Sequence, residues 1–224
     1  MKRTNNIGRI AAVWDLPTRL FHWLLLALVA FSWWSGKNEE VALHIWSGIA
    51  VLTLLVFRLL WGLFGSSTAR FANFVRGPRA VADYLRGRWR GIGHNPLGAL
   101  SVVALLALLS AQVGLGLFAS DEDGLVEGPL AHLVSLGTSE TAAELHEELF
   151  DILLILIGLH IAAVLFYHLI RRKNLVGPMI TGRAVVDPPA EPMRPGRWWV
   201  AALCLIAAIA LSRWVLAGAP PFGS

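Results

Sequence analysis

The hydrophobic and polar positions of this 224-residue chain divide it into five long apolar stretches and the shorter polar segments between them. Each stretch is long enough, or nearly so, to cross the hydrocarbon core of a bilayer as a helix. A helix also pairs its own backbone polar groups, as lipid requires. The predicted spans are residues 20–34, 42–64, 96–119, 149–170 and 198–216. The pattern therefore predicts an all-α integral membrane protein.

The charged residues between the spans alternate in sign along the chain. Lysine and arginine precede the first span and follow the second and the fourth, whereas residues 119–145, after the third, carry only acidic charges. The positive-inside rule then predicts a cytoplasmic N-terminus and an outer C-terminus. The basic residues of these three segments are Lys2, Arg3, Arg9, Arg19, Arg70, Arg76, Arg79, Arg86, Arg88, Arg90, Arg171, Arg172, Lys173, Arg183, Arg194 and Arg197. The acidic residues are Asp121, Glu122, Asp123, Glu127, Glu140 and Glu144.

The composition agrees with this class of protein. Hydrophobic residues make up 56% of the chain, the mean hydropathy is +0.60, and most of the ten tryptophans lie near the ends of spans. The pI near 9.8 comes from basic residues that flank the spans, as membrane topology requires. Nucleic-acid binding is not expected, because the sequence has no motif that would recognise bases or phosphates. The single cysteine, Cys204, excludes an internal disulfide, a Cys-rich zinc site and covalent haem attachment. No cleaved signal peptide is predicted.

Residues 146–174 contain three of the seven histidines within one apolar segment, namely His146, His160 and His168. In a helix, His146 and His160 are separated by about 21 Å of rise and about 40° of rotation. One helix face would therefore present imidazoles at two membrane depths. An ionisable residue within a span is a functional candidate by default, because its burial is costly.

The predicted topology matches these histidines in depth with histidines of other spans. His44 opens the second span at the outer level of His146. His22, at the inner start of the first span, shares its level with His160 or His168, and spacing alone slightly favours His168. Two imidazoles that approach from opposite sides suit b-type haem, whereas zinc needs three or four ligands gathered at one point. The histidines therefore predict two haem sites, one near each membrane surface.

The glycines, the remaining histidines and the connecting segments each lead to a prediction. Small residues near the histidines would allow close approach of a macrocycle or a helix. They are Gly48, Gly98, Gly114, Gly116 and Gly158. His94 and His132 fall in loops and are expected to be solvated. The basic segment 65–95 is expected to anchor the topology on anionic headgroups, with a short helix near residues 78–86. Residues 187–196 form a predicted Pro-rich linker.

Four motifs, LPTRLFHW, LHIWSG, ELHEELFDILLILIGLH and NLVGPMITGR, resemble the bacterial cytochrome b561 family, in particular its nickel-iron hydrogenase b-type cytochrome branch. The resemblance covers about residues 12–183. It implies a four-helix transmembrane bundle with two non-covalent haems b, each held between two histidines. By position, His44 and His146 would hold the outer haem. His22 and His160 would hold the inner haem, with His168 as the alternative inner ligand.

The chain departs from the smallest members of that family by its basic 65–95 loop and its fifth span. We therefore expect three parts: a dihaem four-helix bundle at residues 1–183, a cytoplasmic linker at 184–197, and a fifth transmembrane helix with an outer tail at 198–224.

The predicted function is an electron relay across the bacterial inner membrane. A bis-imidazole iron has no open coordination position, which favours outer-sphere electron transfer. The resemblance implies exchange with the quinone pool and an outer partner that is a hydrogenase subunit, a c-type cytochrome, or superoxide as a direct electron donor with ubiquinone as acceptor. The acidic segment 119–145 is a candidate docking surface for a basic cytochrome c. Arg19 and Arg58 lie near the inner face. Each is either a candidate partner of a haem propionate or a topology charge whose side chain extends to the membrane surface.

Two other classes of function also place histidines in spans. One is a membrane metal-ion transporter, and the other is a structural anchor subunit. Ion routes normally carry carboxylates within the membrane, and Asp151 is the one predicted within these spans. The electron-relay hypothesis is therefore preferred.

Overall fold

The computed structural model describes residues 9–89, 91–121, 123–124, 126–186 and 191–220. Four residues used for the predicted topology, Lys2, Arg3, Arg90 and Glu122, lie outside this range, as do linker residues 187–190.

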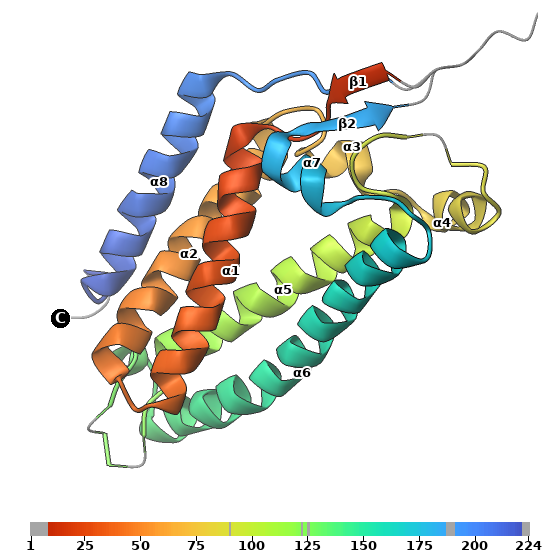
Figure 1. Cartoon of the computed structure of the whole chain (residues 1–224). Coiled ribbons are helices and arrows are strands. Elements are labelled where there is room, and N and C mark those ends of the chain that lie inside the picture. Colours follow the sequence, from red (N-terminus) through yellow and green to blue (C-terminus); the bar gives the residue numbers. More distant parts are fainter. Residues whose placement is uncertain (1–8, 90, 122, 125, 187–190, 221–224) are drawn as a thin grey trace, which may run out of the picture. The chain divides into compact units, whose positions relative to one another are not determined.

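Five helices are long and apolar enough to cross a membrane, judged by length and composition (Figure 1). They are α1 (Leu16–Lys37), α2 (Val41–Phe64), α5 (Pro96–Phe118), α6 (Leu136–Leu169) and α8 (Trp198–Leu216). Each contains one of the predicted apolar stretches to within one or two residues at the ends, and the first and fourth helices are longer than predicted. The predicted fold class, an all-α membrane protein with five spanning helices, is confirmed.

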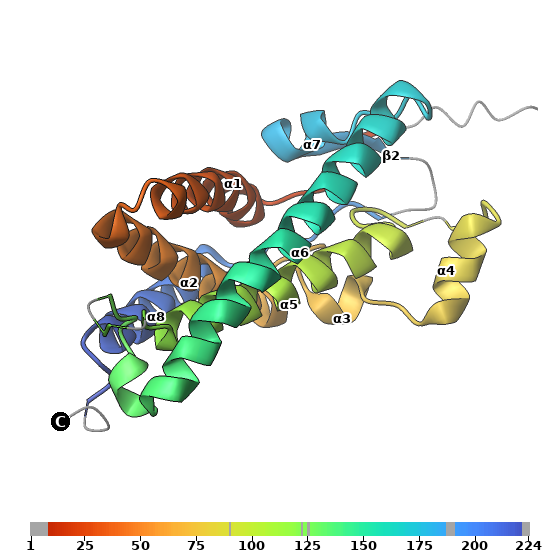
Figure 2. The same cartoon turned by 90° about the horizontal axis from the view of Figure 1, so that it is seen from below.

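The fourth long helix begins well before its apolar segment. α6 is 34 residues long and starts at Leu136, so residues 136–145 are helical and not part of an outer loop as predicted. Ser135 precedes the first turn, where its carbonyl accepts the Ser139 N–H at 3.0 Å. The following residues are mostly good helix formers, which extend the helix although they are polar. Hydropathy alone could not detect this extension. α6 is uninterrupted in both views (Figure 1 and Figure 2).

Short elements occupy the connections between the long helices. They are β1 (Arg9–Ala12), α3 (Phe71–Phe74), α4 (Pro78–Leu85), the 3₁₀ helix η1 (Ala131–Leu133), α7 (Val176–Thr181) and β2 (Arg183–Val186). α4 confirms the short helix expected near residues 78–86. β1 and β2 form an antiparallel pair with Arg9 opposite Val186, which the sequence analysis does not predict, because four-residue strands leave too short an alternation to detect.

The chain separates into two compact units, each described by itself. The first unit comprises Met1–Leu20, Leu59–Val103 and His160–Ala201. The second unit comprises Phe21–Arg58, Ala104–Leu159 and Ala202–Ser224. The predicted bundle boundary at residue 183 falls on the first residue of β2, within the first unit.

A buried carboxylate and a buried indole organise the first unit. Asp15 precedes α1, and its Oδ1 accepts the Thr18 N–H at 2.8 Å, which caps the helix. Its Oδ2 accepts the Trp61 Nε1–H at 2.9 Å. Asp15 is 8% exposed and Trp61 is 1% exposed. One side chain therefore fixes the start of α1 and the end of α2 together.

The segment before α8 is hydrogen-bonded to the same unit. Met193 N–H donates to the Ala12 carbonyl at 2.9 Å, and Ser67 exchanges two hydrogen bonds with Arg194. A Cβ at Gly196 would lie 2.5 Å from Trp61 Cη2, so this backbone lies directly against the indole. Of the predicted Pro-rich linker, residues 193–196 are thus packed on the fold.

Two tyrosines join α4 to the end of α6 within the first unit. The Tyr84 and Tyr167 hydroxyls form a hydrogen bond. Burial, followed by this hydrogen bond, raises the pKa of Tyr84 to about 12. Tyr84 therefore remains a neutral, hydrogen-bonding phenol at physiological pH.

In the second unit, the fifth long helix packs on the second. Ile49, Leu130, Val215 and Ala219 form a buried apolar cluster. Thr53 of α2 donates a hydrogen bond to the Ser212 hydroxyl of α8 at 2.9 Å. Polar side chains within spans are thus paired between helices, as a low-dielectric environment requires.

We predict that Asp15→Ala lowers the free energy of unfolding by about 2–3 kcal/mol, because it removes a helix cap and strands a buried indole N–H. Unfolding in mixed micelles would measure this. Asp15→Asn, which keeps the capping oxygen, should cost less, and in a double-mutant cycle Asp15→Ala should show coupling to Trp61→Phe. Additive effects of these two substitutions would contradict the proposed linkage.

Candidate functional site

His44 of α2 and His146 of α6 lie together in the second unit. Their ring centroids are 6.0 Å apart, and the ring planes are perpendicular. Both residues are half-buried. The structure therefore brings together the two histidines that the sequence analysis places at the outer level.

The His146 imidazole is held by α5. Its Nδ1 lies 2.8 Å from the Gln112 carbonyl oxygen, and the Gln112 Nε2–H donates to the His146 carbonyl at 2.8 Å. A Cβ at Gly116 would lie 2.8 Å from His146 Cε1, closer than such contacts normally allow. Glycine is therefore required for the ring to occupy this place.

The His44 imidazole is held by α1 in the same way. Its Nδ1 lies 2.8 Å from the Ser32 carbonyl oxygen, and the Ser32 hydroxyl is 3.4 Å away. A Cβ at Gly36 would lie 3.1 Å from His44 Nδ1. In both cases the accepting carbonyl belongs to the residue four positions before the glycine.

This repeated arrangement has a physical cause. A helical side chain leans toward the N-terminus and covers the turn that precedes it. A side chain at position 36 or 116 would therefore cover the carbonyl four residues earlier, whereas glycine leaves it open. A carbonyl oxygen has two lone pairs and can accept a second hydrogen bond beside that of its own helix. The two glycines thus make main-chain acceptors available to the histidines.

The hydrogen bonds also determine which ring nitrogen can bind a metal. A carbonyl only accepts, so each Nδ1 carries the proton, which leaves Nε2 of His44 and of His146 as the free donor atom. Metal-binding histidines commonly donate their other N–H to a carbonyl, which fixes the ring orientation. Both side chains therefore have the tautomer and the support expected of metal ligands.

The spacing of the rings fits one metal ion between them. Two imidazoles on opposite sides of a metal, with bonds of about 2 Å, would have centroids about 6.3 Å apart. The measured separation is 6.0 Å. Among the described residues, no group of three or more His, Cys, Asp or Glu side chains could hold a metal ion. The pair therefore offers two nitrogen donors at a spacing that suits one metal ion, fewer than the three or four ligands of a zinc site.

The other predicted ligands are described one by one. His22, in the second unit, is half-buried and packs edge-on against Trp23 with a centroid distance of 5.0 Å. His160, in the first unit, is half-buried, and His168 is exposed. Since His22 and His160 belong to different units, their pairing stays a prediction.

The two loop histidines differ from each other. His132 is exposed, as predicted. The prediction of a solvated His94 is wrong, because His94 lies between Trp14 and Phe74 with both centroid distances 4.5 Å. This aromatic contact depends on residues far away in sequence.

The two arginines predicted near the inner face are both engaged by protein groups. Arg58 is 2% exposed and lies over the Phe21 ring, 6.0 Å from its centroid. Arg19 donates from its guanidinium to the Ile180 carbonyl. Arg58 is thus a buried charge within a span and not a snorkelling one.

Sequence reasoning missed the residues that support the histidines. Ser32, Gly36 and Gln112 were not singled out, and Gly116 was considered only as a small residue. One signal was available: Gln112 is a large polar side chain inside an apolar span, only four residues before a glycine.

Comparisons with known proteins identify a family. The family model described as prokaryotic cytochrome b561 matches residues 13–182. The matched range includes all four proposed ligands and ends before α8. The comparison with curated proteins and the comparison with solved structures each gave no match. The resemblance of the four motifs is confirmed.

We predict opposite effects for two glycine substitutions on α5. Gly116→Ala should lower the free energy of unfolding by about 1–3 kcal/mol, because its Cβ would overlap the His146 ring. Gly114→Ala is the matched control. A Cβ there meets nothing within 4 Å, so the substitution should be neutral or stabilise by up to about 1 kcal/mol. Equal effects in mixed-micelle unfolding would contradict the assigned role of Gly116.

Proposed function

The chain belongs to the prokaryotic cytochrome b561 family, whose members are membrane b-type cytochromes of electron transfer, and we propose that it relays electrons across the bacterial inner membrane through two haems b. The observation that carries this proposal is the His44–His146 pair, with both Nδ1–H groups bonded to main-chain carbonyls.

We propose that His44 and His146 would hold the outer haem. When bound between two imidazoles, haem b supplies one-electron chemistry and offers no open coordination position. The protein residues hold and orient the ligands: Ser32 and Gln112 accept the two Nδ1–H bonds. Hydrogen bonding of this kind increases ligand basicity and so adjusts the reduction potential.

His22 and His160 are proposed as the ligands of the inner haem. His160 follows His146 by fourteen residues on the uninterrupted α6, which corresponds to about 21 Å of helix rise. One helix would then contribute a ligand at each end of the relay. His168 is the alternative inner ligand. Its side chain is exposed, whereas that of His160 is half-buried, which favours His160.

The placement of charged groups around these histidines bears on the alternative of metal-ion transport. In the membrane segment of α6, Asp151 is exposed on the helix surface. A transport route would need polar groups gathered along a path, and the described residues include no such metal-binding group. These features favour electron transfer over metal-ion transport.

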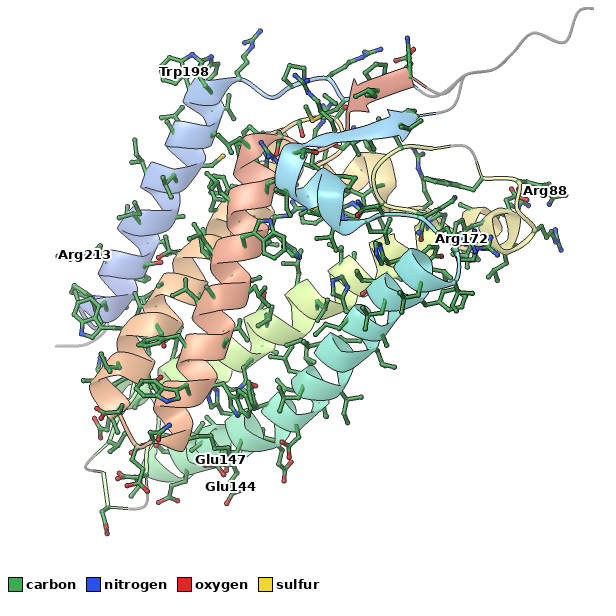
Figure 3. The ribbon with its side chains drawn as sticks, viewed as in Figure 1. Arg88, Glu144, Glu147, Arg172, Trp198 and Arg213 are labelled. Carbon is green, nitrogen blue, oxygen red and sulfur yellow. The ribbon has the colours of Figure 1, made fainter. Side chains whose placement is uncertain are left out.

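The partners are proposed from charge and from the family. The relay exchanges electrons with the quinone pool, for which ubiquinone is the candidate. Outside, the partner is a c-type cytochrome, a hydrogenase subunit or superoxide. Glu144 and Glu147, both exposed near the start of α6, would face a basic partner (Figure 3). This orientation, with a cytoplasmic N-terminus and a periplasmic C-terminus, rests on the positive-inside rule.

We predict two haems b per chain in the purified protein, and the loss of one by His44→Ala or by His146→Ala. Each substitution removes one axial ligand, and the remaining haem should stay low-spin and reducible. Pyridine haemochrome quantification with a reduced-minus-oxidised spectrum would measure both properties. A haem-free wild-type protein would refute the proposal.

We further predict that His160→Ala removes only the inner haem. His168→Ala and His132→Ala are the matched controls, since both side chains are exposed, and both variants should keep two haems. If His168→Ala loses a haem and His160→Ala does not, the inner ligand is His168.

A further inference from the structure

A cavity of about 410 Å³ lies in the first unit, apart from the proposed haem ligands. Its walls come from segments that adjoin the ends of three spanning helices. Ser67 follows the end of α2, Pro96 is the first residue of α5, and Arg194 precedes the start of α8. Residues at span ends lie at the level of the lipid headgroups.

The lining of this cavity is strongly basic. The lining includes three arginines, Arg70, Arg76 and Arg194, and one acidic residue, Glu191. Glu191 accepts a hydrogen bond from Arg194 at 2.8 Å. Within the part of the chain that the structure describes, no ion pair engages Arg70 or Arg76. The cavity therefore carries an excess of positive charge that suits an anionic ligand.

The remaining lining combines polar side chains, among them Ser67 and Asn73, with an apolar part. In the apolar part, Phe74 is 6% exposed, Pro96 is almost fully buried, and Ile92 and Pro192 complete this side. The glycerol and upper acyl carbons of a phospholipid would bury apolar surface against this part of the wall, a gain that a small hydrated anion would not have. Guanidinium groups also match phosphate geometry better than ammonium groups do.

We propose that this cavity binds the headgroup of an anionic glycerophospholipid. The phosphate lies against Arg70 and Arg76, and the glycerol backbone lies against Phe74 and Pro96. The sequence analysis expects diffuse attraction between the 65–95 segment and anionic lipid; the structure narrows this to one cavity and two arginines. The inference does not depend on the haem assignment.

The same segment provides a control for non-specific attraction. Arg79 and Arg86 are exposed, belong to α4 or directly follow it, and do not line the cavity. Arg88, labelled in Figure 3, also lies outside the lining, and it is paired with Asp83. Neutralising Arg79 and Arg86 changes the charge of the loop as much as neutralising Arg70 and Arg76 does.

The test is a titration of the delipidated full-length protein with phosphatidylglycerol, followed by native mass spectrometry. Phosphatidylcholine with the same acyl chains and inorganic phosphate are the comparison probes. We expect Arg70→Gln/Arg76→Gln to weaken phosphatidylglycerol binding by about 25-fold, or about fivefold for each arginine. Arg79→Gln/Arg86→Gln should change it by less than about threefold.

Glu191→Gln should tighten phosphatidylglycerol binding, because it frees Arg194 and removes the competing carboxylate. Misfolding cannot increase affinity. This variant therefore still tests the role of charge in the cavity if the Arg70/Arg76 variant is too unstable to measure. The proposal is overturned if the Arg79/Arg86 control loses as much affinity as the Arg70/Arg76 variant. It is also overturned if phosphatidylcholine binds equally well, or if millimolar inorganic phosphate displaces the lipid.

Discussion

The His44–His146 pair depends on hydrogen bonds that a membrane makes difficult to provide. An imidazole N–H within a span has no water to donate to, and the carbonyls of neighbouring helices already accept bonds from their own chains. Gly36 and Gly116 solve this problem because neither covers the carbonyl four residues earlier. The tautomer, the ring orientation and the free Nε2 atoms of His44 and His146 all follow from these two open carbonyls.

In the other unit, a second buried polar contact also gives a buried N–H group an acceptor on another part of the chain. Asp15 has two acceptor oxygens, and each is used: one by the first turn of α1 and one by the Trp61 indole. Replacing only Asp15 or only Trp61 would remove a hydrogen bond from the other buried side chain. This costs more stability than replacing both side chains with apolar groups of the same shape. In both units, therefore, a polar group shared between two helices fixes how those helices meet.

Much of the fold was predictable because a helix that crosses lipid must be long and apolar, and both properties can be read from the sequence. Span positions follow from hydropathy, and matching His44 with His146 needs only a topology and a count of residues. The early start of α6 was not predictable in this way, since residues 136–145 are helical through propensity and not through apolarity. The carbonyl acceptors of Ser32 and Gln112 were also missed, because main-chain groups have no sequence signature. His160 and His168, eight residues apart on one helix, differ in depth but lie within about 80° of each other, so the pattern alone could not separate them.

The connection into α8 has a consequence for how this protein is related to its family. The family match ends at residue 182, yet the backbone at Gly196 lies against Trp61, and Ser212 of α8 is hydrogen-bonded to Thr53. The C-terminal segment thus covers the Trp61 indole and bonds to a hydroxyl of α2. A shortened chain that ended at the family boundary would expose this indole and lose the bond between Thr53 and Ser212, so residues beyond the boundary form part of the packed fold.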